Sequence, residues 1–427
     1  MNSNNFRKKG PAIYPLSLPL LSNPDKVAKG IYGFFKDECD VFKLDIVFPK
    51  AGVGNSILSK SNIFCADMLL SGTNKLSAQE LNDKLDFLGS YINVTTTYYK
   101  TVLSVYGMNR YFDEVLELIH EAVFFSTFPQ SELDLLKQQK KNNLRVQHQK
   151  TVYQSSVLMN KYWFGDGSIL GKPTDEEDYA VVTRELLQNE FKTKFNECFL
   201  ILTSSIALSS KTKQIEEVFK DKLTEDLTFV AQEIKFIKKH AADSDCFYCV
   251  SNANQSSFNA RLEVDSRNTN DYASITMLNL ILGGYFGSRL MKNIREDKGW
   301  TYGVSSRIVN YSDNAFIEVS GDIQVDKASP VKDVILKEFN KLSHETVSNE
   351  EFETARNYYL GNLQEAFDSY FSFSERHLAL LETKNTLSWY NTFADKIKLL
   401  TPSQVQQAAQ NYLNSNSLIY TWSGPNP

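Results

Sequence analysis

The sequence predicts an α+β protein made of two related halves, each a mostly antiparallel sheet covered by helices. Helical and strand patterns occur in separate blocks, which favours this class over a regularly alternating parallel sheet. A unit of one helix followed by one strand occurs twice along the chain. The chain of 427 residues is also long for a single hydrophobic core.

The repeated unit is an amphipathic helix with a good start signal, followed directly by a buried strand. Its two copies are residues 183–205 and 401–423. They align without a gap, so that Thr183 matches Thr401 and Thr203 matches Thr421. A weaker repeat, with a slightly different offset, joins 68–72 with 280–284. We therefore expect the two halves to share one fold that arose by internal duplication.

In the first half, the capping box Ser77-Ala78-Gln79-Glu80 predicts a helix start, and Gly89 is placed to end that helix. The stretch 91–107 is rich in Thr, Val and Tyr, which predicts a hairpin. Apolar spacing predicts two further helices at 108–125 and 130–149.

The second half repeats this order of elements. The same patterns predict a strand at 247–264, helices at 271–282 and 288–297, strands within 301–323, and helices at 331–342 and from Ser348 onward, with Glu351 closing a capping box. The charged stretch 211–245 suggests a connection between the halves. The expected organisation is an N-terminal domain at 1–215, a linker at 216–242 and a C-terminal domain at 243–427.

Composition excludes several classes of function. The net charge is −5, and no basic patch of the kind that binds nucleic acid is present. The longest apolar run, 275–287, is shorter than the ~20 residues that a membrane helix needs. The N-terminal residues 13–21 contain two prolines and suggest an extended arm or strand, not a signal peptide. Five cysteines are too few and too scattered for a disulfide framework. A cytoplasmic location is expected.

One motif in the second half carries most of the functional information. Its fixed positions are Leu282, Gly283, Gly284, Ser288, Arg289, Leu290, Ile294, Arg295, Glu296, Gly299 and Tyr302. This pattern resembles the second half of the insulinase–pitrilysin zinc peptidases, which include the mitochondrial processing peptidase group. The resemblance implies two similar α+β halves. It further implies that Gly283, Gly284 and Gly287 belong to a substrate-handling loop, and that Arg295 and Tyr302 reach toward a zinc site.

The zinc-binding half of the same pattern is degenerate. Peptidase subunits of the family carry a His-x-x-Glu-His helix, whose histidines bind the metal and whose glutamate is the general base. The matching positions here are Ile63, Ala66 and Asp67, and the family's third ligand falls near Asn142-Asn143. The five histidines are also scattered, with no two within a helical turn. We expect no metal in this chain and no peptide hydrolysis by this chain alone.

Arg295 and Tyr302 are hydrogen-bond donors that can polarise a scissile carbonyl. By spacing alone, a paired surface charge is the favoured interpretation of Arg295 and a core position is that of Tyr302. Within the wider motif, the resemblance implies a non-catalytic subunit of a heterodimeric zinc endopeptidase. This chain would supply Arg295, Tyr302 and half of a peptide chamber, and the zinc would belong to a homologous partner subunit. Two alternatives remain: a structural or assembly subunit without a proteolytic role, and a clamp that binds unfolded peptides by strand addition.

Overall fold

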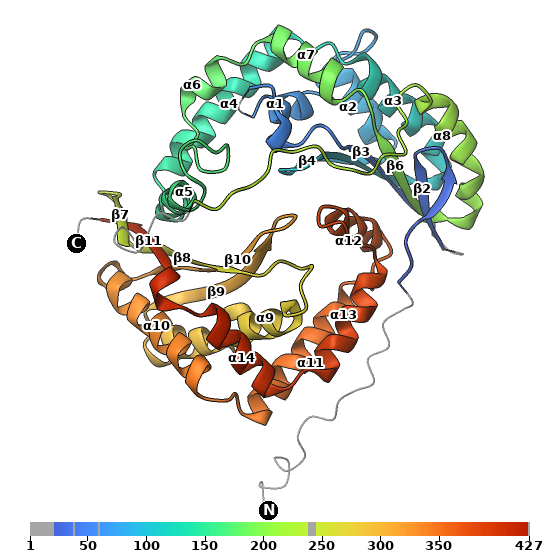
Figure 1. Ribbon diagram of the computed structural model, residues 1–427. Helices are drawn as coiled ribbons and strands as arrows, with labels where there is room; N and C mark the ends of the chain where they lie inside the picture. The colour runs from blue at the N-terminus through green and yellow to red at the C-terminus, as the bar shows by residue number, and fades with distance from the viewer. Residues whose placement is uncertain (1–20, 37–38, 59, 238–244, 426–427) are drawn as a thin grey trace, which may run out of the picture.

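The computed structural model describes residues 21–36, 39–58, 60–237 and 245–425. Two halves face each other, and each consists of a sheet with most of its helices on the outer side (Figure 1). The predicted α+β fold is thereby confirmed. Residues 13–20 of the expected N-terminal arm lie outside the described residues.

The first half contains one six-stranded sheet. Its strands are β1 (Asp25–Ala28), β2 (Ile31–Lys36), β3 (Val41–Phe48), β4 (Tyr91–Thr96), β5 (Thr101–Met108) and β6 (Phe199–Ser205). Its helices are α1 (Ser61–Asp67), α2 (Ala78–Phe87), α3 (Phe112–Phe125), α4 (Gln130–His148), α5 (Thr151–Phe164), α6 (Glu176–Ala180), α7 (Arg184–Lys194) and α8 (Thr212–Phe219).

The second half contains one five-stranded sheet. Its strands are β7 (Asp245–Cys249), β8 (Ser256–Val264), β9 (Thr301–Asn310), β10 (Ala315–Ile323) and β11 (Ile419–Gly424). Its helices are α9 (Tyr272–Asn279), α10 (Ala328–His344), α11 (Asn349–Glu365), α12 (Phe371–Leu381), α13 (Ser388–Leu399) and α14 (Pro402–Tyr412). Two π-helical segments, Leu280–Gly284 and Met291–Asp297, precede β9.

The two sheets have the same topology, as the internal repeat predicts. The order β2-β6-β3-β5-β4 in the first sheet matches β7-β11-β8-β10-β9 in the second, and β1 is an addition at the edge. In both sheets the strand from the repeat, β6 or β11, pairs parallel with one neighbour and antiparallel with the other. The helices before these strands, α7 and α14, both begin at a threonine N-cap, at Thr183 and Thr401.

Each half contributes one helix to the inner face of the opposite sheet (Figure 1). Helix α12, from the second half, lies against the first sheet. Helix α5, from the first half, packs on β8 and β11 of the second sheet. The halves are therefore joined by an exchange of helices in addition to the connecting chain.

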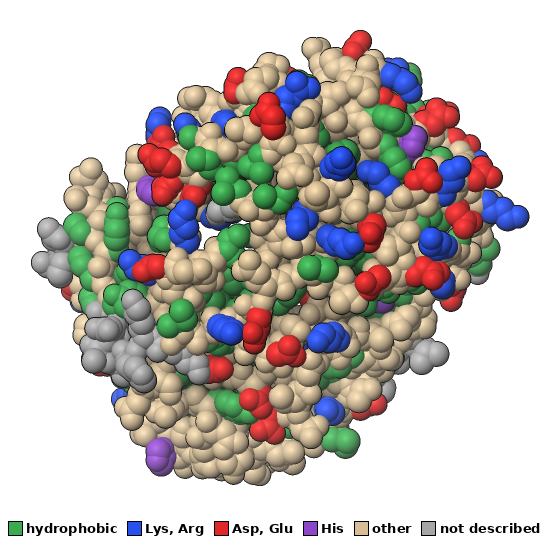
Figure 2. Space-filling model, turned by 45° about the horizontal axis from the view of Figure 1, so that its top comes forward, with side chains coloured by type: hydrophobic (Ala, Val, Ile, Leu, Met, Phe, Trp, Pro, Cys, Tyr) green, Lys and Arg blue, Asp and Glu red, His purple; other side chains and the backbone are tan. Residues whose placement is uncertain are grey.

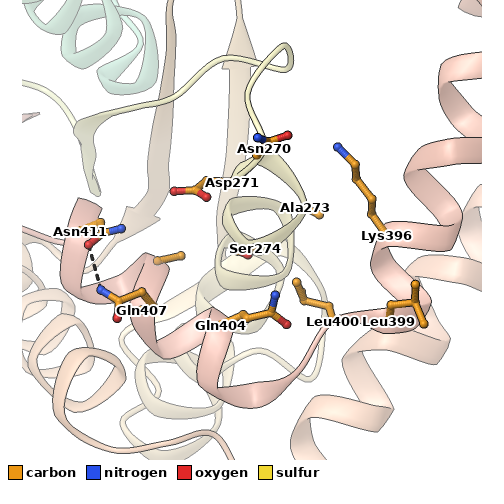
Figure 3. A pocket seen from close by; sticks show the side chains of 11 residues that line it. Asn270, Asp271, Ala273, Ser274, Lys396, Leu399, Leu400, Gln404, Gln407 and Asn411 are labelled. Atoms are coloured by element: carbon orange, nitrogen blue, oxygen red, sulfur yellow. Dashed lines mark hydrogen bonds between the residues drawn. The ribbon is translucent and has the colours of Figure 1, made fainter.

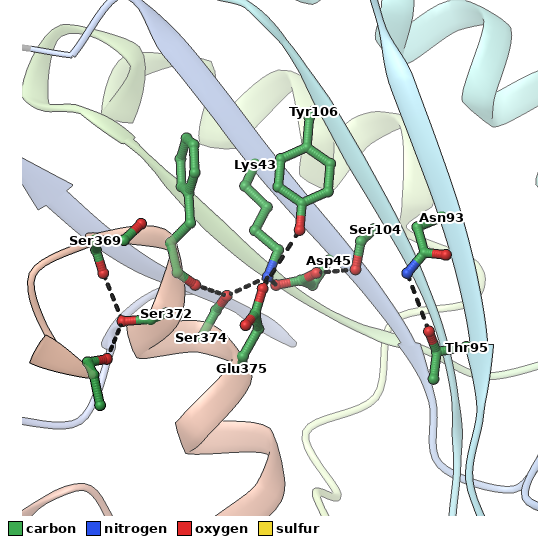
Figure 4. Close-up of polar contacts among 12 residues, drawn as sticks. Lys43, Asp45, Asn93, Thr95, Ser104, Tyr106, Ser369, Ser372, Ser374 and Glu375 are labelled. Carbon is green, nitrogen blue, oxygen red and sulfur yellow. Dashed lines mark hydrogen bonds and ion pairs between the residues drawn. The ribbon is translucent and has the colours of Figure 1, made fainter. Parts of the chain in front are cut away.

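Charged groups fix α12 to the first sheet (Figure 4). The Lys43 ammonium is buried and lies 3.0 Å from Glu375 on α12 and 3.4 Å from Asp45 on its own strand. Lys100, also buried, pairs with Glu382 at the C-terminal end of α12 and donates to the carbonyl of Leu378 at 3.1 Å. Burial lowers the pKa of Lys100, and the neighbouring Glu382 carboxylate opposes this effect.

Helix α5 is held on the second sheet by short polar side chains. Ser423 and Thr421 of β11 donate to the backbone carbonyls of Thr151 and Ser155 at 2.5 and 3.1 Å. Asn259 of β8 donates to the Ser155 hydroxyl at 3.0 Å. These groups are buried, and their hydrogen bonds offset the free-energy cost of removing polar side chains from water.

Most of the predicted elements are confirmed, and the differences have local causes. The Ser77–Glu80 capping box is complete, and Gly89 has a φ of 65°. The strand predicted at 247–264 is wrong, because a turn at 250–255 divides it into β7 and β8. The capping box predicted at Ser348 is incomplete. Its hydroxyl accepts from the Glu351 amide, but the Glu351 carboxylate binds Arg289 instead of turning back to the helix start.

The connection between the halves begins with a helix, since α8 occupies part of the charged stretch 211–245. The chain then runs without helix or strand through residues 224–237. The proposed domain boundaries at 215 and 243 remain a prediction. In the described part of the chain, no helix is long and apolar enough to cross a membrane. Acidic and basic side chains are interspersed over the face shown in Figure 2.

Candidate functional site

The degenerate zinc positions lie on the short helix α1, against the outer face of the first sheet. Ile63 is partly exposed, and Ala66 is buried in the core. Asp67, at the last position of the helix, keeps 34% of its side chain exposed. Neither Ile63 nor Ala66 offers a lone pair, so among the three matching positions only Asp67 presents an oxygen ligand.

An ion pair joins α1 to α4 beside these degenerate positions. The Lys140 ammonium on α4 lies 2.7 Å from the Asp67 carboxylate and 5.1 Å from the centre of the Phe64 ring. The third-ligand position was expected near Asn142-Asn143, but these two residues are exposed on α4 and Lys140 is the residue that faces α1. A cation at this point repels a metal ion.

The start of α1 is fixed by a buried carboxylate from α7. Glu190 is fully buried, accepts from the Ser61 hydroxyl at 2.8 Å and accepts from the Ile57 amide at 3.2 Å. Burial raises the pKa of Glu190. Because both bonds hold the backbone turn before α1, this carboxylate has a structural role.

The residues present do not fit zinc. Among the described residues, no three His, Cys, Asp or Glu side chains lie together in a group able to hold a metal. His377 is buried on α12, where desolvation lowers its pKa to about 4. His240 lies outside the described residues. Cys65, on α1 itself, is buried, and burial raises the pKa of its thiol far above the usual range.

Arg295 lies near the end of the π-helical segment Met291–Asp297, on the turn that leads into β9. Gly299 closes this turn with a φ of 64°, and its amide donates to the Arg295 carbonyl at 3.1 Å. Within the described structure, no carboxylate lies within ion-pair distance of Arg295. Its guanidinium carbon instead lies 4.8 Å from the centre of the Phe286 ring. Arg295 is therefore not part of a paired surface charge in the described structure.

Tyr302 is the extra residue of a β-bulge at the start of β9. Gly303 pairs with Asp322 and Thr301 pairs with Ile323, which leaves Tyr302 without a partner on β10. A bulge of this kind redirects a side chain at the end of a strand. The Tyr302 side chain is 98% exposed, so it is not a core tyrosine, and its hydroxyl has no protein partner in the described part of the chain.

The three glycines of the predicted substrate loop differ in their surroundings. Gly283 is buried, and a Cβ there would lie 2.7 Å from the Cβ of Ser306 on β9. Gly283 therefore permits close packing of the π-helical turn on the strand. A Cβ at Gly284 would lie 3.2 Å from the Asn279 carbonyl oxygen, and one at Gly287 would lie 2.8 Å from the Tyr285 ring. The substrate contact of these glycines remains a prediction.

Arg289, in the same motif, has a structural partner. Its guanidinium makes two parallel bonds of 2.9 Å to the Glu351 carboxylate at the start of α11. This bidentate pair fixes the segment that carries Arg295 against the outer helical layer.

The cavity in Figure 3 lies between α9, α13 and α14, and it contains neither Arg295 nor Tyr302. It has a volume of about 410 Å³, and Asn270, Gln404, Gln407 and Asn411 contribute amide groups to its wall. The two donors thus lie outside this cavity; Tyr302 is exposed, and Arg295 is partly buried.

Sequence reasoning missed two residues that define the site. Lys140 follows Leu133 and Leu136 and precedes Leu144 on the inward stripe of α4, and this spacing indicates an inward-pointing lysine but not its partner on α1. Phe286 offered no such signal, because a single aromatic residue in a glycine loop has no periodic context.

Comparison with known proteins agrees with this fold and site. Residues 62–163 match the family model described as Insulinase (Peptidase family M16), and residues 191–359 match the one described as Peptidase M16 inactive domain. The chain belongs to the M16, or insulinase, family of peptidases, which confirms the resemblance inferred from its motifs. Within this family it is an inactive member, in which Ile63 and Ala66 replace the first ligand and the general base.

Two curated relatives are of similar size. The chain is 24% identical to the uncharacterized zinc protease YmxG of Bacillus subtilis over 322 residues, which is 72% of this chain and 74% of that protein. It is also 24% identical to the non-peptidase homolog YmxG of Helicobacter pylori over 324 residues, covering 72% of each.

Solved structures show the same fold. A peptidase M16 inactive domain from Pseudomonas fluorescens superposes with a TM-score of 0.77 at 19% identity, over 93% of this chain and 96% of that one. A protease from Helicobacter pylori gives a TM-score of 0.81 at 13% identity, over 93% and 98%.

Proposed function

We propose that this chain is the non-catalytic subunit of a two-subunit zinc endopeptidase. One observation carries the proposal: the metal positions on α1 do not fit zinc, while in the described structure Arg295 and Tyr302 stand without acidic or hydrogen-bonding partners. Both side chains are therefore available to a ligand outside this chain. The zinc-bearing partner would be a homologous subunit with an intact His-x-x-Glu-His helix.

The two side chains suit the recognition of a peptide carbonyl. The Arg295 guanidinium is always charged and offers several N–H donors in one plane, and the Tyr302 hydroxyl offers one O–H. Donors aimed at the carbonyl oxygen stabilise the negative charge that develops on it during hydrolysis. Zinc chemistry would belong to the partner, and this chain would bind and polarise the substrate.

The exposure of Tyr302 is the reason to expect a second subunit. Stabilisation of developing charge is strong only where water is excluded. Tyr302 is 98% exposed in the single chain, so nothing in the described structure excludes water from it. A partner surface laid over this end of β9 would close the site and form the other half of a peptide chamber.

The test is turnover of the complex with the zinc-bearing partner. We expect Arg295→Ala and Tyr302→Phe each to lower kcat/KM by about 10²-fold, the usual effect of losing one oxyanion donor. Matched controls are Arg145→Ala, an exposed arginine paired with Glu176, and Tyr248→Phe, an exposed tyrosine on β7. Both controls should leave turnover unchanged. Unchanged turnover in the Arg295 and Tyr302 variants would overturn the proposal.

A peptide-binding clamp is the second candidate, and sheet edges favour it. Strands β4 and β9 each stand at one end of the strand order in their sheets. A free edge can accept an extended peptide by strand addition. Binding of an unfolded peptide by the isolated chain, without any effect on a peptidase, would favour the clamp. A stable homodimer that captures no zinc-bearing partner would favour a structural or assembly subunit.

A further inference from the structure

We propose that Phe286 is a positioning residue that orients the Arg295 guanidinium toward the substrate carbonyl. This inference rests on the proposed function and adds a residue to it. It starts from one contact, in which the Arg295 guanidinium carbon lies 4.8 Å from the centre of the Phe286 ring. Phe286 lies in the loop between the two π-helical segments, and Arg295 lies on the second of them.

Phe286 lies at the surface, whereas its neighbour in the sequence is packed. Its side chain is 62% exposed, although an aromatic ring gains free energy when it is buried. Tyr285, the preceding residue, instead packs against Tyr358 on α11, with ring centres 5.1 Å apart. Adjacent aromatic residues therefore have different roles: Tyr285 anchors the loop, and Phe286 stands at its tip.

The loop holds the ring in place from both sides. After the ring, the Ser288 amide donates to the Tyr285 carbonyl at 3.1 Å and closes a tight turn around Phe286. Immediately beyond the turn, Arg289 is fixed by its two bonds to Glu351. A ring carried on a turn that is anchored at both ends is a defined support for a neighbouring side chain.

The geometry of the contact suits the chemistry proposed for Arg295. A guanidinium that lies over a ring is attracted by the π-system, and this attraction leaves the N–H groups free to donate to other partners. An ion pair with Glu296 or Asp297 would occupy the same N–H groups. The ring therefore supports the charge and leaves its donors available to a peptide carbonyl.

The experiment measures kcat/KM of the complex with the zinc-bearing partner, with fluorescein-labelled casein as an unfolded substrate. We expect Phe286→Leu, which keeps an apolar side chain but has no π-system, to lower kcat/KM roughly three- to tenfold, the scale of a cation–π contact. Phe286→Tyr and Phe286→Trp should retain the wild-type value. In an Arg295→Ala background, Phe286→Leu should change nothing further, because the residue acts through Arg295.

Two results would overturn the inference: wild-type kcat/KM in Phe286→Leu, or a loss of equal size in the Arg295→Ala background. The outcome for Arg295→Ala alone separates this inference from the proposed function, because unchanged turnover in that single variant rejects the function itself. A measurement on the isolated chain tests the contact without a partner. The ¹⁵N–¹H signal of the Arg295 side chain should carry a ring-current shift that Phe286→Leu removes and Phe286→Tyr keeps, and an unchanged signal in Phe286→Leu would reject the contact.

Discussion

Asp67 and Lys140 show how an ion pair joins two helices beside the degenerate motif. The Lys140 ammonium on α4 lies 2.7 Å from the Asp67 carboxylate at the end of α1. This contact links the two helices and places a positive charge next to the one oxygen ligand among the three matching positions. A positive charge there disfavours a metal ion.

Restoring ligands at these positions should restore metal binding. The triple variant Ile63→His, Asp67→His and Lys140→Glu places two imidazoles one helical turn apart on α1 and a carboxylate on α4. We expect the folded variant to bind zinc in isothermal titration calorimetry, and the wild-type chain not to bind it.

The single variant Asp67→His is the matched control, since one imidazole beside Lys140 should not hold the ion. A folded triple variant without zinc affinity would show that Lys140 does not stand at the third-ligand position.

The sequence alone located the loss at Ile63, Ala66 and Asp67, because ligand chemistry depends on residue type. It did not locate the partner of Asp67, because that contact joins α1 to a helix distant in the sequence and depends on how the two helices pack. Phe286 was missed for a similar reason. A stack between a ring and a guanidinium depends on the shape of a loop, and no periodic pattern encodes that shape.

Helix α12 illustrates the energetics of a single element. Two lysines of the first half hold it, but their surroundings differ. Lys43 has Asp45 as a second carboxylate, and Glu375 is 60% exposed. Lys100 is buried and has Glu382, 20% exposed, as its only carboxylate in the described structure.

Loss of Glu382 should therefore cost more than loss of Glu375. Glu382→Gln leaves a buried ammonium without a counter-charge, which should lower the free energy of unfolding by about 3 kcal/mol. Glu375→Gln removes a largely exposed partner and should cost about 1 kcal/mol or less. Urea denaturation of the full chain measures both values. Equal losses would show that Asp45 does not compensate Lys43.

Helices and the hairpin were predictable from the sequence because their signals are local. Capping residues, apolar spacing and β-branched runs lie within the element that they specify, as at Ser77 and in the stretch 91–107. The division of 247–264 into β7 and β8 was not predicted. Both parts have the composition of a strand, and the turn between them is marked only by Ser251, Asn252 and Asn254, because it contains no glycine or proline.

The exchange of α5 and α12 shapes the molecule as a whole. The repeat of the helix–strand unit predicted two like sheets, and the structure confirms this. The repeat could not predict the exchange, because the sequence pattern shows which face of a helix is apolar but not which sheet it covers. Polar residues on the inner faces, such as Asn259 and Lys43, gave no hint of burial, yet both are buried.

The exchange predicts that neither half is stable without the other. We expect residues 1–237 and 245–427, produced together as separate chains, to associate and purify as one complex. The reason is that α5 of the first fragment covers the second sheet and α12 of the second fragment covers the first. Produced alone, each fragment should aggregate, since its sheet exposes a face that is buried in the full chain.

Ser155→Lys in the first fragment is a useful variant for this experiment. Ser155 is fully buried against β8 and β11, so a lysine there should weaken co-purification. Two fragments that remain soluble and monomeric when separate would contradict the prediction.

The exchanged helices also limit the motions by which one chain can open. A hinge motion that separates the two halves would have to pull α5 away from the second sheet and α12 away from the first. Under the proposed function, a polypeptide would therefore reach the site through the interface with the partner subunit, and the rate of opening should depend on that interface and not on the connecting segment within one chain.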